Sequence, residues 1–318
     1  MTGFIIRRVI QSIIVVLLVT MITFILLRAI PGNPALAILG PAAYRNPASV
    51  AKFDAEYGFN KPWFIQYFLW LGHLLQGNLG YSWKLNQSVA SLLGNHLPKT
   101  IILVGIATLI ALVIALPIGI WQAVKRNKPV DYTFTAVSFL LYAAPVFFVG
   151  TVLILVFSVK LHWFAAEGPQ GGALNDLTDW KAMTLPVATL ALLTIAQFSR
   201  YMRSSVLDNI TEDYVRTARA KGASERRVLV HHVVRNSLIP IATLLGLSLP
   251  GILAGALVTE SLFNYPGMGY LFFQSALQQD YPVLLGFIVV VAIATVVGSF
   301  LADIAYAVLD PRVRYTQT

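Results

Sequence analysis

Cysteine is absent from the chain and charged residues are scarce. Without a thiol among its 318 residues, the protein cannot form disulfides, thiolate metal sites or cysteine-ligated iron–sulfur clusters. Asp, Glu, Lys and Arg together make up 12% of the residues, whereas soluble domains average about 25%. A soluble protein of this length needs more charge to cover its surface, so the composition favours a membrane protein.

The apolar residues, 57% of the chain, form six long blocks that contain no Asp, Glu, Lys or Arg. Roughly 20 residues at about 1.5 Å each cross the hydrocarbon core of a bilayer, and each block is about that long. The sequence therefore predicts an all-α integral membrane protein with six transmembrane helices. The predicted spans are residues 9–27, 100–123, 132–159, 182–199, 237–259 and 281–302.

The basic residues are unevenly distributed between the two sides of these spans. One side carries most of them, whereas the opposite loops, residues 160–181 and 261–281, contain only Lys160 and Lys181. By the positive-inside rule both termini are cytoplasmic, and the net charge of +9 indicates contact with anionic lipid rather than nucleic acid. The residues on the basic side are Arg7, Arg8, Lys125, Arg126, Lys128, Arg200, Arg203, Arg216, Arg219, Lys221, Arg226, Arg227, Arg235, Arg312 and Arg314.

This topology divides the chain into four parts, one of them a large external segment between spans 1 and 2. The parts are an N-terminal transmembrane helix (1–30), the external segment (31–99), a core of spans 2–6 with a cytoplasmic loop at 200–237 (100–311), and a cytoplasmic tail (312–318).

The external segment opens with Pro31-Gly32-Asn33-Pro34, a strong helix stop. Its apolar, aromatic stretch at residues 62–76 is too short to span a bilayer. We expect this stretch to form an amphipathic helix on the outer face or packed over the bundle.

Prolines recur inside the predicted spans, at Pro117, Pro145, Pro186 and Pro250. Neighbouring helices can satisfy the carbonyls that such kinks release, so membrane helices tolerate them. The sequence leaves open whether these kinks shape a pathway or reflect ordinary packing.

The loop at 200–237 is longer than a connection between two spans requires. Asn209 and Glu212 have the spacing of a capping box, and the helix that follows can end at Gly222. Ser224 can cap a second helix. We therefore expect two short helices, broken at Gly222, that present a basic surface to either lipid headgroups or a cytoplasmic partner.

The centre of this loop resembles the EAA loop of permease subunits in ATP-binding-cassette (ABC) importers. The residues are Tyr214-Val215-Arg216-Thr217-Ala218-Arg219-Ala220-Lys221-Gly222, and the dipeptide/oligopeptide branch of that family typically has R-T-A-R-A-K-G here. Arg216-Thr217-Ala218 stands where the general loop has Glu-Ala-Ala, and Arg235 where many members have proline. Both departures are usual within the peptide branch.

Further elements match the family pattern in order along the chain. They are Ile30-Pro31-Gly32-Asn33-Pro34, Gly77-Asn78-Leu79-Gly80-Tyr81-Ser82, Glu260-Ser261-Leu262-Phe263-Asn264-Tyr265-Pro266-Gly267-Met268-Gly269, Asp280-Tyr281-Pro282, and Asp303 with the closing Leu309-Asp310-Pro311-Arg312-Val313-Arg314-Tyr315.

The resemblance implies the transmembrane domain of a type I ABC importer in the cytoplasmic membrane of a bacterium or archaeon, carrying dipeptides or oligopeptides. It implies a homologous second permease subunit, two cytoplasmic ATPase subunits and an extracytoplasmic substrate-binding protein. This chain would be a non-catalytic permease without a cofactor, because ATP and Mg would bind to the partner ATPases. The same branch also carries nickel complexes, glutathione and oligosaccharides, and no residue identifies the cargo.

The resemblance also implies which residues bind the partners. The ATPase-coupling loop would comprise Glu212, Tyr214, Arg216, Thr217, Ala218, Arg219, Lys221, Gly222 and Glu225. Ala218 and Gly222 fit close approach to an ATPase groove, with the charged residues at its rim. At the outer mouth, Glu260, Pro266, Gly267 and Asp280 are candidates for contact with the binding protein or the peptide; for Glu260 and Asp303 a structural role is the alternative.

The sequence shows no catalytic or metal-binding pattern. Lys99-Thr100 is the one Lys-Ser/Thr pair, and Pro98 stands where a nucleotide-binding loop has glycine. His231 and His232 are adjacent, hence about 100° apart on a helix and poorly placed to share a metal. A secondary transporter that works alone, or a scaffold that docks a cytosolic protein, are the other classes compatible with this sequence.

Overall fold

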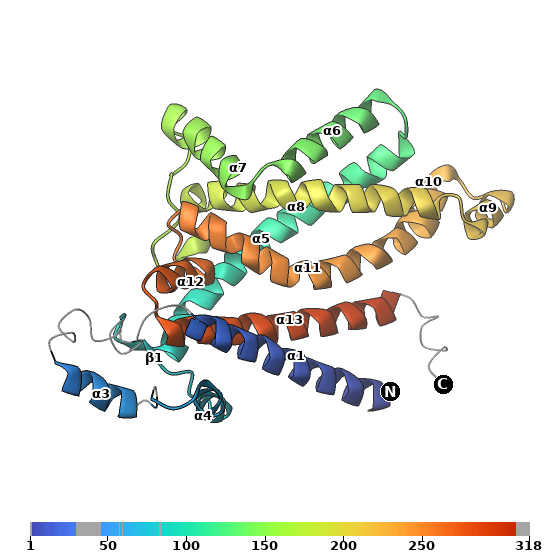
Figure 1. Cartoon of the computed structure of the whole chain (residues 1–318). Coiled ribbons are helices and arrows are strands. Elements are labelled where there is room, and N and C mark those ends of the chain that lie inside the picture. Colours follow the sequence, from blue (N-terminus) through green and yellow to red (C-terminus); the bar gives the residue numbers. More distant parts are fainter. Residues whose placement is uncertain (1, 30–45, 57, 59, 83, 310–318) are drawn as a thin grey trace. The chain divides into compact units, whose positions relative to one another are not determined.

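A computed structural model of the chain describes residues 2–29, 46–56, 58, 60–82 and 84–309 (Figure 1). The strands among these residues are one antiparallel pair, β1 (Tyr81–Ser82) and β2 (Gln87–Ser88). The helices are α1 (Thr2–Ala29), α3 (Pro47–Glu56), α4 (Trp63–Leu75), α5 (Val89–Val124), α6 (Pro129–Ala143), α7 (Val146–Leu153), η2 (Ile154–Lys160), η3 (Asn175–Leu177), α8 (Trp180–Asn209), α9 (Asp213–Ala220), α10 (Glu225–Arg227), η4 (Val228–Val234), α11 (Arg235–Leu262), α12 (Met268–Leu277) and α13 (Tyr281–Leu309).

The contacts divide the chain into two compact units, each of which is described by itself. Unit 1 comprises Met1–Pro98 and Pro266–Val296, and unit 2 comprises Lys99–Tyr265 and Val297–Thr318. The expected helix stop at Pro31-Gly32-Asn33-Pro34 and the matching residues from Asp310 onward lie outside the described residues, as does the side chain of Asp303.

Five helical segments in the described part of the chain are long and apolar enough to cross a membrane. They are Arg7–Ala29, Val89–Val124, Trp180–Asn209, Glu225–Gly246 and Tyr281–Phe300, and the number rises to six if a bent pair of helices counts as one span. The described chain is therefore a helical protein with several membrane-crossing segments.

The bent pair lies where the sequence predicted a span at residues 132–159 with a proline kink. Pro129–Ala143 and Val146–Lys160 meet at an angle of 104°. The break falls at Pro145, whose ring disfavours the helical conformation of the residue before it; Ala144 is accordingly extended, with ψ of 131°. Pro117 and Pro186, by contrast, lie inside α5 and α8, which continue past them.

Unit 2 is built around α8, which packs against α6, α7 and α11. Buried aliphatic residues of α5 and α8 form much of its core, among them Leu103, Ala107 and Leu190. Gly119 lets the backbones of α5 and α8 approach closely, because a Cβ at this position would lie 2.6 Å from the carbonyl oxygen of Ser199. Small residues at such crossings are typical of packed membrane helices.

Unit 1 joins the N-terminal helices to α12 and the first part of α13. The apolar stretch predicted to be amphipathic is α4, and it packs on α1. The hydroxyl of Tyr67 lies 3.2 Å from that of Thr20 and donates to the carbonyl of Leu17, while its ring packs edge-on against Phe24. The stretch thus takes the second of its two expected places, packed against a long helix.

A buried polar network closes one end of unit 2. The ammonium of Lys99 donates to the carboxylate of Asp176 at 2.8 Å and to the carbonyl of Gly171 at 2.9 Å. The hydroxyl of Tyr265 donates to the other oxygen of Asp176 at 2.6 Å, and Lys99, Asp176 and Tyr265 are each at most 4% exposed. Burial raises the pKa of the Tyr265 phenol well above its usual value, so this hydroxyl stays protonated and acts as a donor.

We expect Asp176→Asn to lower the thermal stability of the full chain in detergent. Lys99 would keep a buried charge without its counter-charge, and breaking such a pair from one side costs about 3–5 kcal/mol. Asp208→Asn, the same change at an exposed position of α8, should leave the melting temperature unchanged.

Replacing Lys99 by Met together with Asp176 by Leu should recover most of that loss, since an apolar pair of similar volume leaves no buried charge. Equal melting temperatures for the Asp176 and Asp208 variants would contradict the structural role of this network.

Candidate functional site

The short helix α9 begins directly after α8. Its first residue, Asp213, places a carboxylate at the positive end of the helix dipole. The expected capping box is not formed, because Glu212 occupies the N-cap position without a side-chain hydrogen bond. Asn209 instead completes the last turn of α8, and its amide oxygen accepts a 2.6 Å hydrogen bond from the hydroxyl of Tyr214. The prediction of a capping box was therefore wrong, since α8 extends up to Asn209.

The C-terminus of α9 is a Schellman motif centred on Gly222. Gly222 has φ of +78°, a left-handed conformation that glycine adopts without a Cβ penalty. Its N–H donates to the carbonyl of Arg219 at 2.9 Å, and the N–H of Ala223 donates to the carbonyl of Ala218 at 3.2 Å. Ala218 and Ala223 lie in the same hydrophobic cluster, as is typical of this motif. The predicted helix stop at Gly222 is confirmed.

A bidentate ion pair spans the same turn. The guanidinium of Arg219 donates to both carboxylate oxygens of Glu225, at 2.9 and 3.1 Å. Both side chains are largely exposed, so solvent weakens the attraction, and pairs of this kind contribute at most about 1 kcal/mol. The geometry nevertheless joins the last turn of α9 to the first residue of α10.

One side of α9 is buried in the core of unit 2. Val215 is fully buried and Ala218 is 8% exposed, and both belong to a cluster with residues of α5, α8 and the segment after α10. Ala218 was expected to allow a partner's close approach, but the structure uses its small side chain for packing within the chain. Gly222 remains exposed, with open space where a Cβ would lie.

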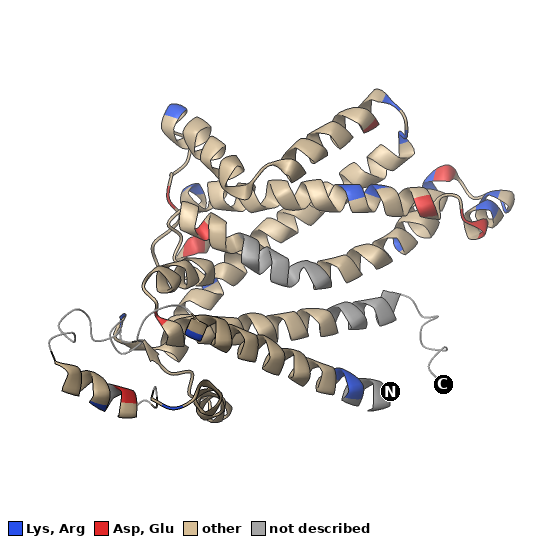
Figure 2. Cartoon of the chain, in the orientation of Figure 1, with Lys and Arg blue, Asp and Glu red and all other residues tan. Residues whose placement is uncertain are grey.

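The other side of α9 is polar and exposed. Figure 2 shows Lys and Arg on α9 and α10 at this end of unit 2. The turn between α5 and α6 carries Lys125, Arg126 and Lys128 and lies at the same end of unit 2. Ala123, just before this turn, packs in the same hydrophobic cluster as the buried side of α9. We call this exposed surface the α9 rim; it comprises Glu212, Asp213, Arg216, Thr217, Arg219, Ala220, Lys221, Gly222 and Glu225.

The second short helix expected after Gly222 is not a separate element. Ser224 does stand at the N-cap of α10, but its side chain makes no capping hydrogen bond. α10 continues through the π-helical turn η4 into α11, so that the α9 turn leads directly into a long membrane-crossing segment. This prediction is corrected, because no breaking residue separates the apolar residues of η4 from α11.

The four residues expected at an outer contact surface are mostly buried. Glu260, in unit 2, is fully buried and accepts a 2.6 Å hydrogen bond from Thr100. In unit 1, Gly267 is the buried N-cap residue of α12 and Pro266 is partly exposed. Asp280 is 4% exposed and accepts a hydrogen bond from Ser82; burial raises its pKa although that bond opposes the shift. Three of the four thus have structural positions rather than surface ones.

The stretch from Glu260 to Tyr265 packs against the loop before α8. The N–H of Gly168 donates to the carbonyl of Phe263 at 2.7 Å, and a Cβ on Gly168 would lie 2.9 Å from the ring of Tyr265. Phe263 and Tyr265 are both fully buried. This stretch therefore holds the loop before α8 in place: Gly168 leaves room for the ring of Tyr265, and both aromatic side chains pack in the interior.

Besides the Lys99–Asp176 pair, a partly buried ion pair was not predicted from the sequence. Asp131, in the first turn of α6, accepts two hydrogen bonds of 2.7 Å from the guanidinium of Arg203 in α8. Arg203 had been counted only among the basic residues of one side. The two residues are 72 positions apart, and the signal available was an acidic residue isolated at the edge of an apolar block. Their pairing neutralises both charges between the packed helices α6 and α8.

Comparison with known proteins identifies the family to which these features belong. Residues 115–315 match the family described as binding-protein-dependent transport system inner membrane component, and residues 1–104 match the N-terminal family of such membrane components. The chain is 39% identical to the oligopeptide transport system permease protein AppB of Bacillus subtilis, over 99% of this chain and all of that protein. It is 35% identical to the oligopeptide transport system permease protein OppB of Haemophilus influenzae, with the same coverage.

The fold has a solved counterpart. An inward-facing structure of the MetNI methionine ABC transporter aligns with a TM-score of 0.55 at 15% identity, covering 69% of this chain and 96% of that chain. Together with the family matches and the full-length relatives, the several membrane-crossing helices and the two-sided α9 lead to one conclusion: the chain belongs to the family of peptide ABC transporter permeases, the inner membrane components of binding-protein-dependent transport systems.

Proposed function

We propose that this transmembrane subunit forms half of the pathway for oligopeptides or dipeptides, and that α9 receives the movement of a separate ATPase subunit. The complete importer would contain a homologous second permease, two cytoplasmic ATPases and an extracytoplasmic binding protein. The names of relatives in Bacillus subtilis and Haemophilus influenzae support peptides as the cargo.

The observation that carries the proposal is that α9 has one side buried in the core and the other side polar and exposed. Its Val215 and Ala218 side is packed into the core of unit 2, so a force applied to the helix is transmitted to α5 and α8. Its rim is polar, exposed and bounded by the turn at Gly222. A docking element requires both properties, whereas a helix that only binds headgroups needs no rigid attachment to the bundle.

The charge pattern supports a cytoplasmic position for the α9 rim. Arg216, Arg219 and Lys221 lie at the end of unit 2 that also carries the basic turn between α5 and α6. Basic residues beside membrane spans favour the cytoplasmic side. In this orientation both termini and the ATPases would be on that side, and the binding protein would approach from the other.

A first test replaces Gly222. We expect Gly222→Trp to preserve membrane insertion and to abolish peptide-stimulated ATP hydrolysis by the reconstituted complex, since an indole would project from the rim into the partner's groove. A Cβ at Gly222 would have no atom of its own chain within 4 Å, and the backbone strain of a non-glycine residue at this positive φ is shared by the control variant below.

Gly222→Asn is the matched control, because asparagine tolerates the left-handed conformation and is small. It should retain most of the stimulated activity. Normal coupling in the Trp variant would contradict docking at this turn.

A second test separates the buried side of α9 from its rim. Val215→Ala should destabilise the chain by roughly 2 kcal/mol through lost burial and a small cavity, and should lower its melting temperature in detergent. Arg216→Ala, at the neighbouring exposed position, should leave the melting temperature unchanged but weaken copurification of the ATPase. If Arg216→Ala destabilises the chain as Val215→Ala does, or copurification is unaffected by it, the rim does not bind the partner.

A further inference from the structure

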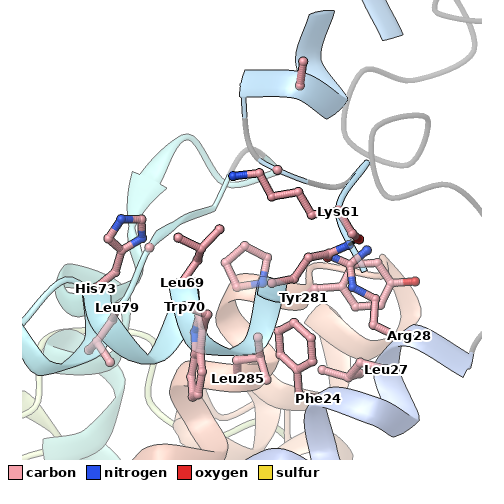
Figure 3. Close-up of a pocket in the computed structure, with 15 residues that line it drawn as sticks. Phe24, Leu27, Arg28, Lys61, Leu69, Trp70, His73, Leu79, Tyr281 and Leu285 are labelled. Carbon is pink, nitrogen blue, oxygen red and sulfur yellow. Dashed lines mark hydrogen bonds between the residues drawn. The ribbon is translucent and has the colours of Figure 1, made fainter. Parts of the chain in front are cut away.

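A cavity of about 570 Å³ lies within unit 1, among α1, α3, α4 and the start of α13 (Figure 3). Its volume falls inside the range of roughly 300–1,000 Å³ that is usual for ligand pockets. It takes no part in the function proposed for α9, which belongs to unit 2. Its lining therefore calls for a separate explanation.

The lining is apolar on one side and basic on the other. Figure 3 shows Phe24, Trp70 and Leu285 together along one side, with Lys61 reaching across the opposite side. Arg28 and His73 lie towards the two ends. None of the described residues that line the cavity is acidic. Such a lining fits a molecule with a long apolar part and an anionic group.

The position of the cavity along α1 shows how the apolar part and the anionic group of such a molecule would lie relative to the membrane. Arg28 is the next-to-last residue of the membrane-crossing segment Arg7–Ala29, where a guanidinium can reach the headgroup layer. Phe24 lies one helical turn, about 6 Å, further into that segment. The basic side is therefore at headgroup level and the apolar side extends towards the acyl chains.

The surroundings of the cavity are those of a surface that contacts lipid. On α1, Ile22 and Leu26 are more than half exposed, and on α4 Phe68 is 65% exposed. Exposed apolar side chains on a membrane-crossing helix and on the helix packed against it are suited to contact with acyl chains in a bilayer. A lipid can therefore reach the cavity from the membrane.

We propose that the cavity between α1, α4 and α13 binds a phospholipid with an anionic headgroup, its phosphate beside Lys61 and Arg28 and an acyl chain along Phe24, Trp70 and Leu285. The guanidinium of Arg28 is held in place by a hydrogen bond to Gln66 and lies 5.7 Å from the centre of the Phe24 ring. The planar guanidinium is the group whose geometry best suits recognition of phosphate oxygens.

A peptide fits this lining less well than a lipid. At neutral pH a free peptide carries an amino terminus as well as a carboxylate, and the amino terminus requires an acidic or carbonyl-rich partner. The described lining residues are apolar, basic or neutral polar, the last being Gln66 and Tyr281, and none is a carboxylate; Asp54 is within electrostatic range of Arg28 but does not line the cavity. The anionic lipid is therefore the occupant that the chemistry favours.

The test measures lipid binding to the full-length chain purified in mild detergent, by native mass spectrometry. Phosphatidylglycerol and phosphatidylcholine are titrated separately, because they share acyl chains and differ in net charge. We expect wild type to bind phosphatidylglycerol at least fivefold more tightly, and Lys61→Gln to reduce its affinity for phosphatidylglycerol roughly fivefold, as for one basic residue near an anionic surface.

Lys52→Gln is the matched control, since Lys52 lies on α3, is exposed and does not line the cavity. It should bind phosphatidylglycerol as wild type does. Equal affinity for the two lipids, or an equal effect of the Lys61 and Lys52 variants, would overturn the proposal.

Two further measurements keep the result unambiguous. Ala55→Phe, which fills the cavity, should weaken lipid binding, whereas Ala51→Phe on the same exposed helix should not; this pair decides the matter if Lys61→Gln fails to fold. Displacement of phosphatidylglycerol by inorganic phosphate alone, or by a tripeptide that Lys61→Gln no longer binds, would identify a free-anion or peptide site and overturn the lipid assignment.

Discussion

The packing of one side of α9 into the core of unit 2 is the interaction on which the functional interpretation depends. Val215 and Ala218 share a cluster with residues of α5, α8 and the segment that leads into α11. A helix of eight residues is too short to be stable by itself in water. Tertiary burial therefore holds α9 in place, and any partner that moves its rim also moves the membrane helices beneath it.

The turn at Gly222 extends that constraint into the next membrane-crossing segment. The Schellman hydrogen bonds end α9, and the Arg219–Glu225 pair joins it to α10, which continues without interruption through η4 into α11. A π-helical turn at this junction differs from the α-helical hydrogen-bond pattern on both sides, and such turns are frequent at functional sites. Helix α9 is thus attached at both of its ends, to α8 and to α11.

Local features of this site were predictable from the sequence and distant contacts were not. The helix end at Gly222 depends on the left-handed backbone conformation of one residue, and a glycine at that position indicates such a conformation directly. The ion pairs Lys99–Asp176 and Arg203–Asp131 join residues more than 70 positions apart, so no local pattern predicts them. The bend at Pro145 was visible as a proline, but its angle of 104° follows from the packing of α6 and α7 against α8 and α11. Resemblance to the family singled out Glu260 and Asp280 as contact residues, whereas both side chains are buried, which no local pattern indicates.

Because the chain contains no cysteine, a single engineered one reports on its surroundings without interference. The most direct measurement is cross-linking of Lys221→Cys, on the α9 rim, to the ATPase subunit in the intact complex, compared with Tyr81→Cys on the exposed edge of β1 in unit 1. Docking at α9 predicts a cross-link to the ATPase from position 221 and none from position 81. A cross-link from position 81, or none from position 221 in a complex that hydrolyses ATP, would contradict it.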